Sequence, residues 1–158
     1  MSTRPRSSPA HASRRTARLH AVQALYQRAA QATPVPQLLR EFHAHRLGVE
    51  VEDLDFGEAD GAFFDDVVTG TAAREAEIDA AIAPHLAGGW SLARLDPLML
   101  QLLRAGTYEL LARPDVPAAA VVSEYAALAH AFYAPAEAGF ANALLDRLAG
   151  VLRAGGGP

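Results

Sequence analysis

Apolar residues recur every three or four positions along most of the chain, from about residue 13 to residue 153. This spacing gives an α-helix one continuous apolar face. No stretch alternates convincingly between apolar and polar residues, so strands are not expected. The pattern predicts an all-α protein of about seven helices in two packed helical subdomains.

The first helix is expected to begin after Ser13, a residue type that suits the N-cap position. It should end before the sequence ATPVP, where two prolines interrupt the pattern. The residues expected on its buried face are Val22, Leu25, Tyr26 and Ala29, and those expected on the opposite side are Thr16, His20, Gln23 and Gln27.

A second helix is predicted from about Val35 to Arg46, followed by an acidic loop over 48–60. One long helix is predicted over 61–86, with Pro84 kinking or ending it. Ser91 is a candidate cap for a short turn, and Pro117 is expected to open the next-to-last helix. The packed faces in the second half are expected to comprise Leu95, Met99, Leu102, Leu103, Gly106 and Leu110, then Val121, Tyr125, Leu128 and Phe132, then Phe140, Leu144, Leu148 and Val151 or Leu152.

The sequence AGGW at 87–90 marks the boundary between the two halves. The expected organisation is a disordered basic tail over 1–12, an N-terminal helical subdomain over 13–86, a C-terminal helical subdomain over 87–153 and a flexible tail over 154–158.

Charge is distributed unevenly along the chain. Residues 1–40 contain seven arginines and no acid, whereas the remainder contains the other seven basic residues and all 18 acids, for a net charge of -4. All the basic residues are arginine. This asymmetry predicts a basic surface that meets a polyanion, on a body that otherwise repels one.

Few enzymatic chemistries fit the sequence. The absence of cysteine excludes a disulfide framework, a thiolate nucleophile and a zinc site with sulfur ligands. His43 and His45 are two positions apart and therefore point to different sides of a helix, so no metal site is expected. Asp65 and Asp66 fit a solvated helix face, and no Gly-rich phosphate loop follows a strand. We expect neither an enzyme nor a cofactor.

No apolar run reaches the ~20 residues that a membrane-spanning helix needs, and no secretory signal is visible. We therefore expect a cytoplasmic protein without a membrane partner.

Arg14, Arg15 and Arg18 stand near the predicted start of the first helix, with no carboxylate close to them in sequence. Cations at a helix N-terminus oppose the helix dipole. The cluster could simply solubilise the helix end. The alternative is that an external anion balances it, and the phosphates of a nucleic acid are the natural candidates.

The segment RRTARLHAVQALYQ resembles the opening helix of the NusB family of transcription antitermination factors. The resemblance continues in order through FFDDVVTG, IDAAIAPHL, LLRAGTYELL, DVPAAAVVSEYAALAHAF and GFANALLDRL, and covers roughly residues 13–150. It implies a non-enzymatic fold of two helical subdomains. It also implies binding to NusE, a small-subunit ribosomal protein, and to the single-stranded boxA element of nascent ribosomal RNA, within an RNA polymerase antitermination complex. A homodimer is a further possibility, since relatives differ in oligomeric state.

By position, the resemblance implies that Arg14, Arg15, Arg18, Tyr26 and Phe140 contact RNA. Arginines would follow phosphates while the aromatic rings stack on bases. Tyr26 and Phe140 also fit an apolar core. Asn142 is expected to tie the last helix to a neighbouring loop rather than to read a base.

The sequence departs from the family pattern at Ser123, Ala127, His130 and Gly139, which replace an Asn, an acid and two lysines. These changes bear on RNA affinity and sequence preference more than on the fold. The alternative function is a helical protein–protein adaptor with little RNA binding of its own. NusB-like domains also precede RNA methyltransferase domains, for which a chain that ends at Pro158 leaves no room.

Overall fold

The computed structural model describes residues 9–45 and 59–154. Within these residues the chain forms seven α-helices and two 3-10 turns, with no strand. They are α1 (Pro9–Gln31), α2 (Val35–His45), α3 (Gly61–Ala73), α4 (Glu75–Ile82), η1 (Ala83–His85), η2 (Leu92–Arg94), α5 (Pro97–Ala112), α6 (Ala118–Phe132) and α7 (Pro135–Leu152). The predicted all-α class is confirmed.

The first helix begins earlier than the sequence predicted. It starts at Pro9 rather than after Ser13, so residues 9–12 of the expected disordered tail are helical. Proline suits a helix start because its missing N–H has no helical acceptor there. The rest of that tail, the predicted acidic loop up to residue 58 and residues 155–158 lie outside the described residues.

The buried face of α1 is rotated from the predicted one. Val22 and Leu25 are buried as expected, but Tyr26 is 43% exposed and Ala29 is also exposed. Thr16, expected on the outer side, is buried. The rotation follows from packing, because α3 and α5 cover one side of α1 while α2 and α6 touch it less.

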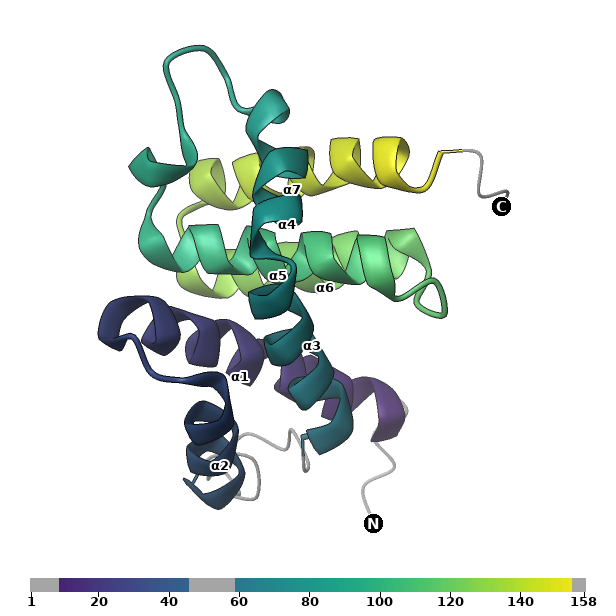
Figure 1. Cartoon of the computed structure of the whole chain (residues 1–158). Coiled ribbons are helices and arrows are strands. Elements are labelled where there is room, and N and C mark those ends of the chain that lie inside the picture. Colours follow the sequence, from purple (N-terminus) through teal and green to yellow (C-terminus); the bar gives the residue numbers. More distant parts are fainter. Residues whose placement is uncertain (1–8, 46–58, 155–158) are drawn as a thin grey trace.

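The helix predicted over 61–86 is broken at Arg74, which ends α3 and precedes α4. Asp60 caps α3, accepting a hydrogen bond from the backbone N–H of Phe63. Pro84 lies in the 3-10 turn that ends the segment, as predicted. The two helices follow one another, α3 over α1 and α4 over α5 (Figure 1).

The second half differs from the predictions at single residues. Ser91 occupies the N-cap position of η2, as predicted, but its side chain makes no capping hydrogen bond. Asp96 caps the following helix α5, with its carboxylate accepting from the N–H groups of Leu98 and Met99. Pro117 is the N-cap of α6 rather than its first residue. Phe132 at the end of α6 is exposed.

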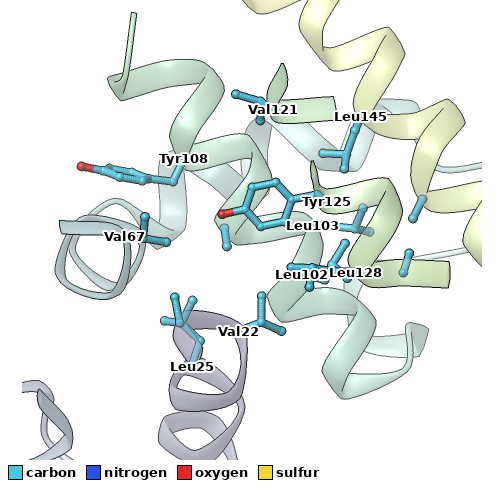
Figure 2. Packing of buried hydrophobic residues seen from close by; sticks show 14 of the residues in the cluster. Val22, Leu25, Val67, Leu102, Leu103, Tyr108, Val121, Tyr125, Leu128 and Leu145 are labelled. Atoms are coloured by element: carbon cyan, nitrogen blue, oxygen red, sulfur yellow. The ribbon is translucent and has the colours of Figure 1, made fainter. Parts of the chain in front are cut away.

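Helix α5 connects the two halves of the chain. It packs on α1, α3 and α4 from the first half and on α6 and α7 from the second. Figure 2 shows Val22 and Leu25 of α1 pointing toward side chains of α3 and α5, with Tyr125 of α6 inside the same cluster. The helices before and after the Gly88–Gly89 turn therefore share one continuous core.

Arg153, the residue that ends α7, fastens this helix to the region between α5 and α6. Its guanidinium donates hydrogen bonds to four backbone carbonyls, those of Glu109, Leu110, Arg113 and Val116, over 2.7–3.2 Å. The Leu110 carbonyl lies in the last turn of α5, where helix carbonyls lack a partner within the helix. The Glu109 and Arg113 carbonyls also accept backbone N–H groups, from Arg113 and Val116.

Candidate nucleic-acid interface

Arg15 on α1 is paired with Glu124 on α6. Its Nε and Nη2 donate to the two carboxylate oxygens over 3.1 and 3.0 Å. The Arg15 side chain is 49% exposed and that of Glu124 is 18% exposed. The hydrogen bonds and the charge of Glu124 raise the pKa of Arg15. Arg15 is thus a surface cation whose inner side is already occupied by a carboxylate.

Arg18, one turn further along α1, is buried. Its Nε and Nη2 donate to Glu109 on α5 over 2.9 Å each, and its Nη1 lies 3.5 Å from Glu124. The Tyr125 hydroxyl also donates to Glu109. Burial alone lowers the pKa of Arg18, but the hydrogen bonds and charge of Glu109 outweigh it and the net pKa is raised. We call these five residues, Arg15, Arg18, Glu109, Glu124 and Tyr125, the arginine–carboxylate network.

Arg14 has a different carboxylate partner from Arg15 and Arg18. Its Nε lies 3.7 Å from Asp60, with both side chains one-third exposed. Its guanidinium carbon stands 4.6 Å from the centre of the Phe63 ring, which Arg18 and Arg113 also approach, at 4.9 and 5.0 Å. Three cations around one ring make favourable cation–π contacts, so Phe63 helps to hold this basic cluster in place.

The three arginines were expected to need an external anion because they were placed at the helix N-terminus without a nearby carboxylate. Both of these assumptions are wrong. Because α1 begins at Pro9, the arginines lie beyond its first turn, where the helix dipole acts weakly. Carboxylates distant in sequence lie close to all three: Asp60 at Arg14, Glu124 at Arg15 and Glu109 at Arg18. The cluster is therefore largely neutralised by the chain itself.

The two predicted aromatic residues differ in exposure. Tyr26, at 43% exposed, presents part of its ring to solvent on the outer side of α1. Phe140 on α7 is half-buried and packs against the core. Both helices pack on α5. Tyr26 is thus the more available of the two for stacking, while Phe140 combines a packing role with a partly open ring.

The positions at which the sequence departs from the family pattern lie on the surface. Ser123, Ala127, His130 and Gly139 are all exposed. A Cβ at Gly139 would meet nothing within 4 Å, so a longer side chain would fit there. Each change therefore alters the surface without altering the packing.

The acidic pair on α3 is partly exposed, as the sequence suggested, but each acid also has a partner on another element. Asp65 lies 2.6 Å from His43 Nε2 on α2. Asp66 accepts from the Tyr108 hydroxyl over 2.7 Å and from Arg113 over 3.1 Å. Both acids therefore join α3 to neighbouring elements. Across the part of the chain that the structure describes, no group of three or more histidines and acids is placed to hold a metal ion.

Sequence reasoning missed Glu109, Glu124 and Tyr125, although they decide the electrostatics of the arginines. Glu109 is 91 residues from Arg18, and Glu124 is 109 residues from Arg15. One signal was present: Glu109 interrupts the otherwise apolar stretch GTYELL. A carboxylate in a buried helix needs a cation, and the unpaired arginines of the first helix were candidates.

No helix among the described residues is both long and apolar enough to cross a bilayer.

Comparisons with known proteins agree with this fold. A family model, the NusB family, matches residues 15–150. The transcription antitermination protein NusB of Sphingopyxis alaskensis is 60% identical over 136 residues, covering 86% of this chain and 91% of that protein. The solved T. maritima NusB is 29% identical with a TM-score of 0.70, covering 86% of this chain and 89% of that one.

A crystal structure of the antitermination factors NusB and NusE in complex with dsRNA has a chain of the same fold. Its TM-score is 0.71 at 21% identity, over 88% of this chain and 97% of that one.

Proposed function

The chain belongs to the NusB family, and from this membership we propose that it is an RNA-binding transcription antitermination factor of the bacterial cytoplasm. It binds a boxA-like single strand of the ribosomal RNA leader together with NusE, and supports transcription of ribosomal RNA operons within an RNA polymerase complex. The chain is not an enzyme, since the family to which it belongs comprises antitermination proteins.

The observation that carries the RNA proposal is the arrangement of Arg15 and Tyr26 on α1. The two residues are 11 positions apart, close to three full helical turns, so they lie on the same side of the helix about 16 Å apart. Both are substantially exposed. A cation for phosphate and a ring for a base, aligned along one helix, are the elements that single-strand binding requires.

We assign the remaining residues by their burial. Arg14 adds a second accessible cation, and Phe140 adds a partly open ring on α7. Arg18 is held in the core by Glu109, so we assign it a structural role beneath the site and not a direct contact with RNA. The crystallised NusB and NusE complex with dsRNA, which has the same fold, is consistent with both partners.

The proposal is tested by titrating labelled single-stranded boxA RNA, and a scrambled strand, with and without NusE over a range of salt concentrations. Arg15→Ala should weaken binding and flatten the slope of log K against log salt by about 0.7. Tyr26→Ala should cost about 1–3 kcal/mol of binding without changing that slope, because it removes a stacking contact. Arg74→Ala is the matched control, since Arg74 lies at the α3–α4 junction.

Equal binding of the scrambled strand would remove the sequence preference, and an unchanged slope for Arg15→Ala would remove Arg15 from the site. The adaptor alternative is favoured by one observation, the carboxylate partners of the three arginines. It predicts NusE association that is the same with and without RNase in a pull-down.

A further inference from the structure

Glu124 is shared between two arginines of unequal accessibility. It receives two hydrogen bonds from Arg15, and its Oε1 also lies 3.5 Å from Nη1 of Arg18. The other two donor groups of Arg18 are engaged by Glu109. Glu124 would therefore keep a cationic neighbour if Arg15 moved away.

Accessibility decreases along the arginine–carboxylate network from the surface to the core. The side chains are 49% exposed at Arg15, 18% at Glu124, 6% at Arg18 and 0% at Glu109. Arg15 is therefore the member that a ligand in solution can reach first. Arg18 cannot leave without stranding the Glu109 carboxylate in the core, which is costly.

We propose that Glu124 is an internal competitor that occupies Arg15 until an RNA phosphate displaces it, with Arg18 retaining the Glu124 carboxylate after the exchange. A phosphate offers the Arg15 fork the same paired oxygens that Glu124 offers. An ion pair at the surface is weak, so a strand with many phosphates can displace Glu124 from Arg15 at little cost. Glu124 thereby sets the affinity of the site, and this inference rests on the RNA-binding function proposed above.

The decisive experiment is a double-mutant cycle between Glu124→Gln and Arg15→Ala, read by the affinity for labelled single-stranded boxA RNA. Glutamine keeps the shape of the side chain and removes its charge, so Glu124→Gln should tighten binding about two- to fivefold, the equivalent of a surface ion pair. The gain should largely disappear when residue 15 is alanine, because the competitor then has nothing to occupy.

The matched control is Glu77→Gln. Glu77 forms a comparable exposed pair with Arg74 over 2.6 Å, on α4. This variant also removes one negative charge and frees one arginine, but away from the network. An equal gain from Glu77→Gln would show that only net charge matters, and would overturn the proposal.

A second measurement uses the unmodified protein, in case Glu124→Gln is poorly folded. The side-chain Nε–H signals of Arg15 and Arg18 are followed by NMR while boxA RNA is added. The Arg15 signal should shift as its acceptor changes, while the Arg18 signal should stay in place because Glu109 holds it. A static Arg15 signal in the presence of bound RNA would overturn the proposal.

The outcomes separate this inference from the proposed function. If the wild-type chain binds no RNA, both fail. If it binds RNA and Glu124→Gln binds equally or more weakly, RNA binding stands and the competition is rejected, because Glu124 would then be positioning Arg15 for the phosphate.

Discussion

Arg18 and Glu109 face one another across the interface of α1 and α5, joined by two hydrogen bonds of 2.9 Å in a region closed to solvent. Arg18→Met should destabilise the fold by about 3–5 kcal/mol, because it leaves the Glu109 carboxylate buried without its cation. Urea denaturation monitored by circular dichroism measures the change.

The double variant, in which Glu109→Met accompanies Arg18→Met, is the informative comparison. It removes both charges at once, so it should recover most of the lost stability. A double variant as unstable as the single one would mean that the pair matters for its shape or its other hydrogen bonds rather than for its charge balance.

The ring of Tyr108 on α5 packs directly against Gly70 on α3. A Cβ at position 70 would overlap the ring and its hydroxyl. Tyr108 cannot easily move aside, since its hydroxyl is bonded to Asp66 over 2.7 Å. Gly70→Ala should therefore cost about 1–3 kcal/mol in the free energy of unfolding.

Gly150→Ala is the control for that experiment. Gly150 is also helical, but a Cβ there would meet nothing within 4 Å. This variant should be more stable by about 0.5–1 kcal/mol, since alanine has the higher helix propensity. Similar effects at the two positions would show that helix propensity, rather than the ring of Tyr108, decides the outcome.

Thr71 on α3 carries a buried hydroxyl with no hydrogen-bond partner among the described residues. Thr71→Val replaces it with a methyl group of similar size and should raise the free energy of unfolding by about 1 kcal/mol or more. Thr107→Val tests the opposite case, because the Thr107 hydroxyl donates to the Leu103 carbonyl over 2.7 Å. Its loss should be neutral or cost up to about 1 kcal/mol, and a gain as large as that of Thr71→Val would contradict the explanation.

Alkaline pH should weaken the fold through Tyr108. Burial, together with the hydrogen bond to Asp66, raises the pKa of Tyr108 from 10.0 to about 12. The folded state therefore favours the neutral phenol, a contribution that is complete below pH 10 and lost as the pH rises to about 12.

Comparison of wild type with Tyr108→Phe isolates this contribution. The stability difference between them, measured by urea midpoints, should shrink across that pH range. Parallel pH curves would place the alkaline loss at other groups, such as Tyr125, whose burial also raises its pKa.

Hydrophobic spacing was enough to predict the all-α class and the approximate position of most helices, because each helix buries a continuous face. Val22 and Leu25 lie in the core as their spacing required. The width and rotation of that face depend on neighbouring helices, which the spacing does not reveal. Tyr26 was therefore assigned to the buried face, although it is exposed. The break at Arg74 has no comparable signal, since the sequence around it favours a continuous helix.

The sequence was enough to choose residues of the candidate site, but not to predict which carboxylates pair with its arginines. Arg15 could be chosen from the local excess of arginines and Tyr26 only from the family resemblance, and both are accessible. The acids that neutralise the arginines arrive from α5 and α6, and their distance along the chain hides them from any local pattern. A local excess of charge therefore predicts a need for partners without saying whether the chain provides them.

The hydrogen bonds that Arg153 donates to the region between α5 and α6 have a consequence for folding during protein synthesis. The four carbonyl acceptors are synthesised some forty residues before the guanidinium that binds them. During translation, the earlier helices leave the ribosome with the junction of α5 and α6 still open. These hydrogen bonds can form only once the C-terminal end of α7 has left the ribosome, so an incomplete nascent chain lacks them.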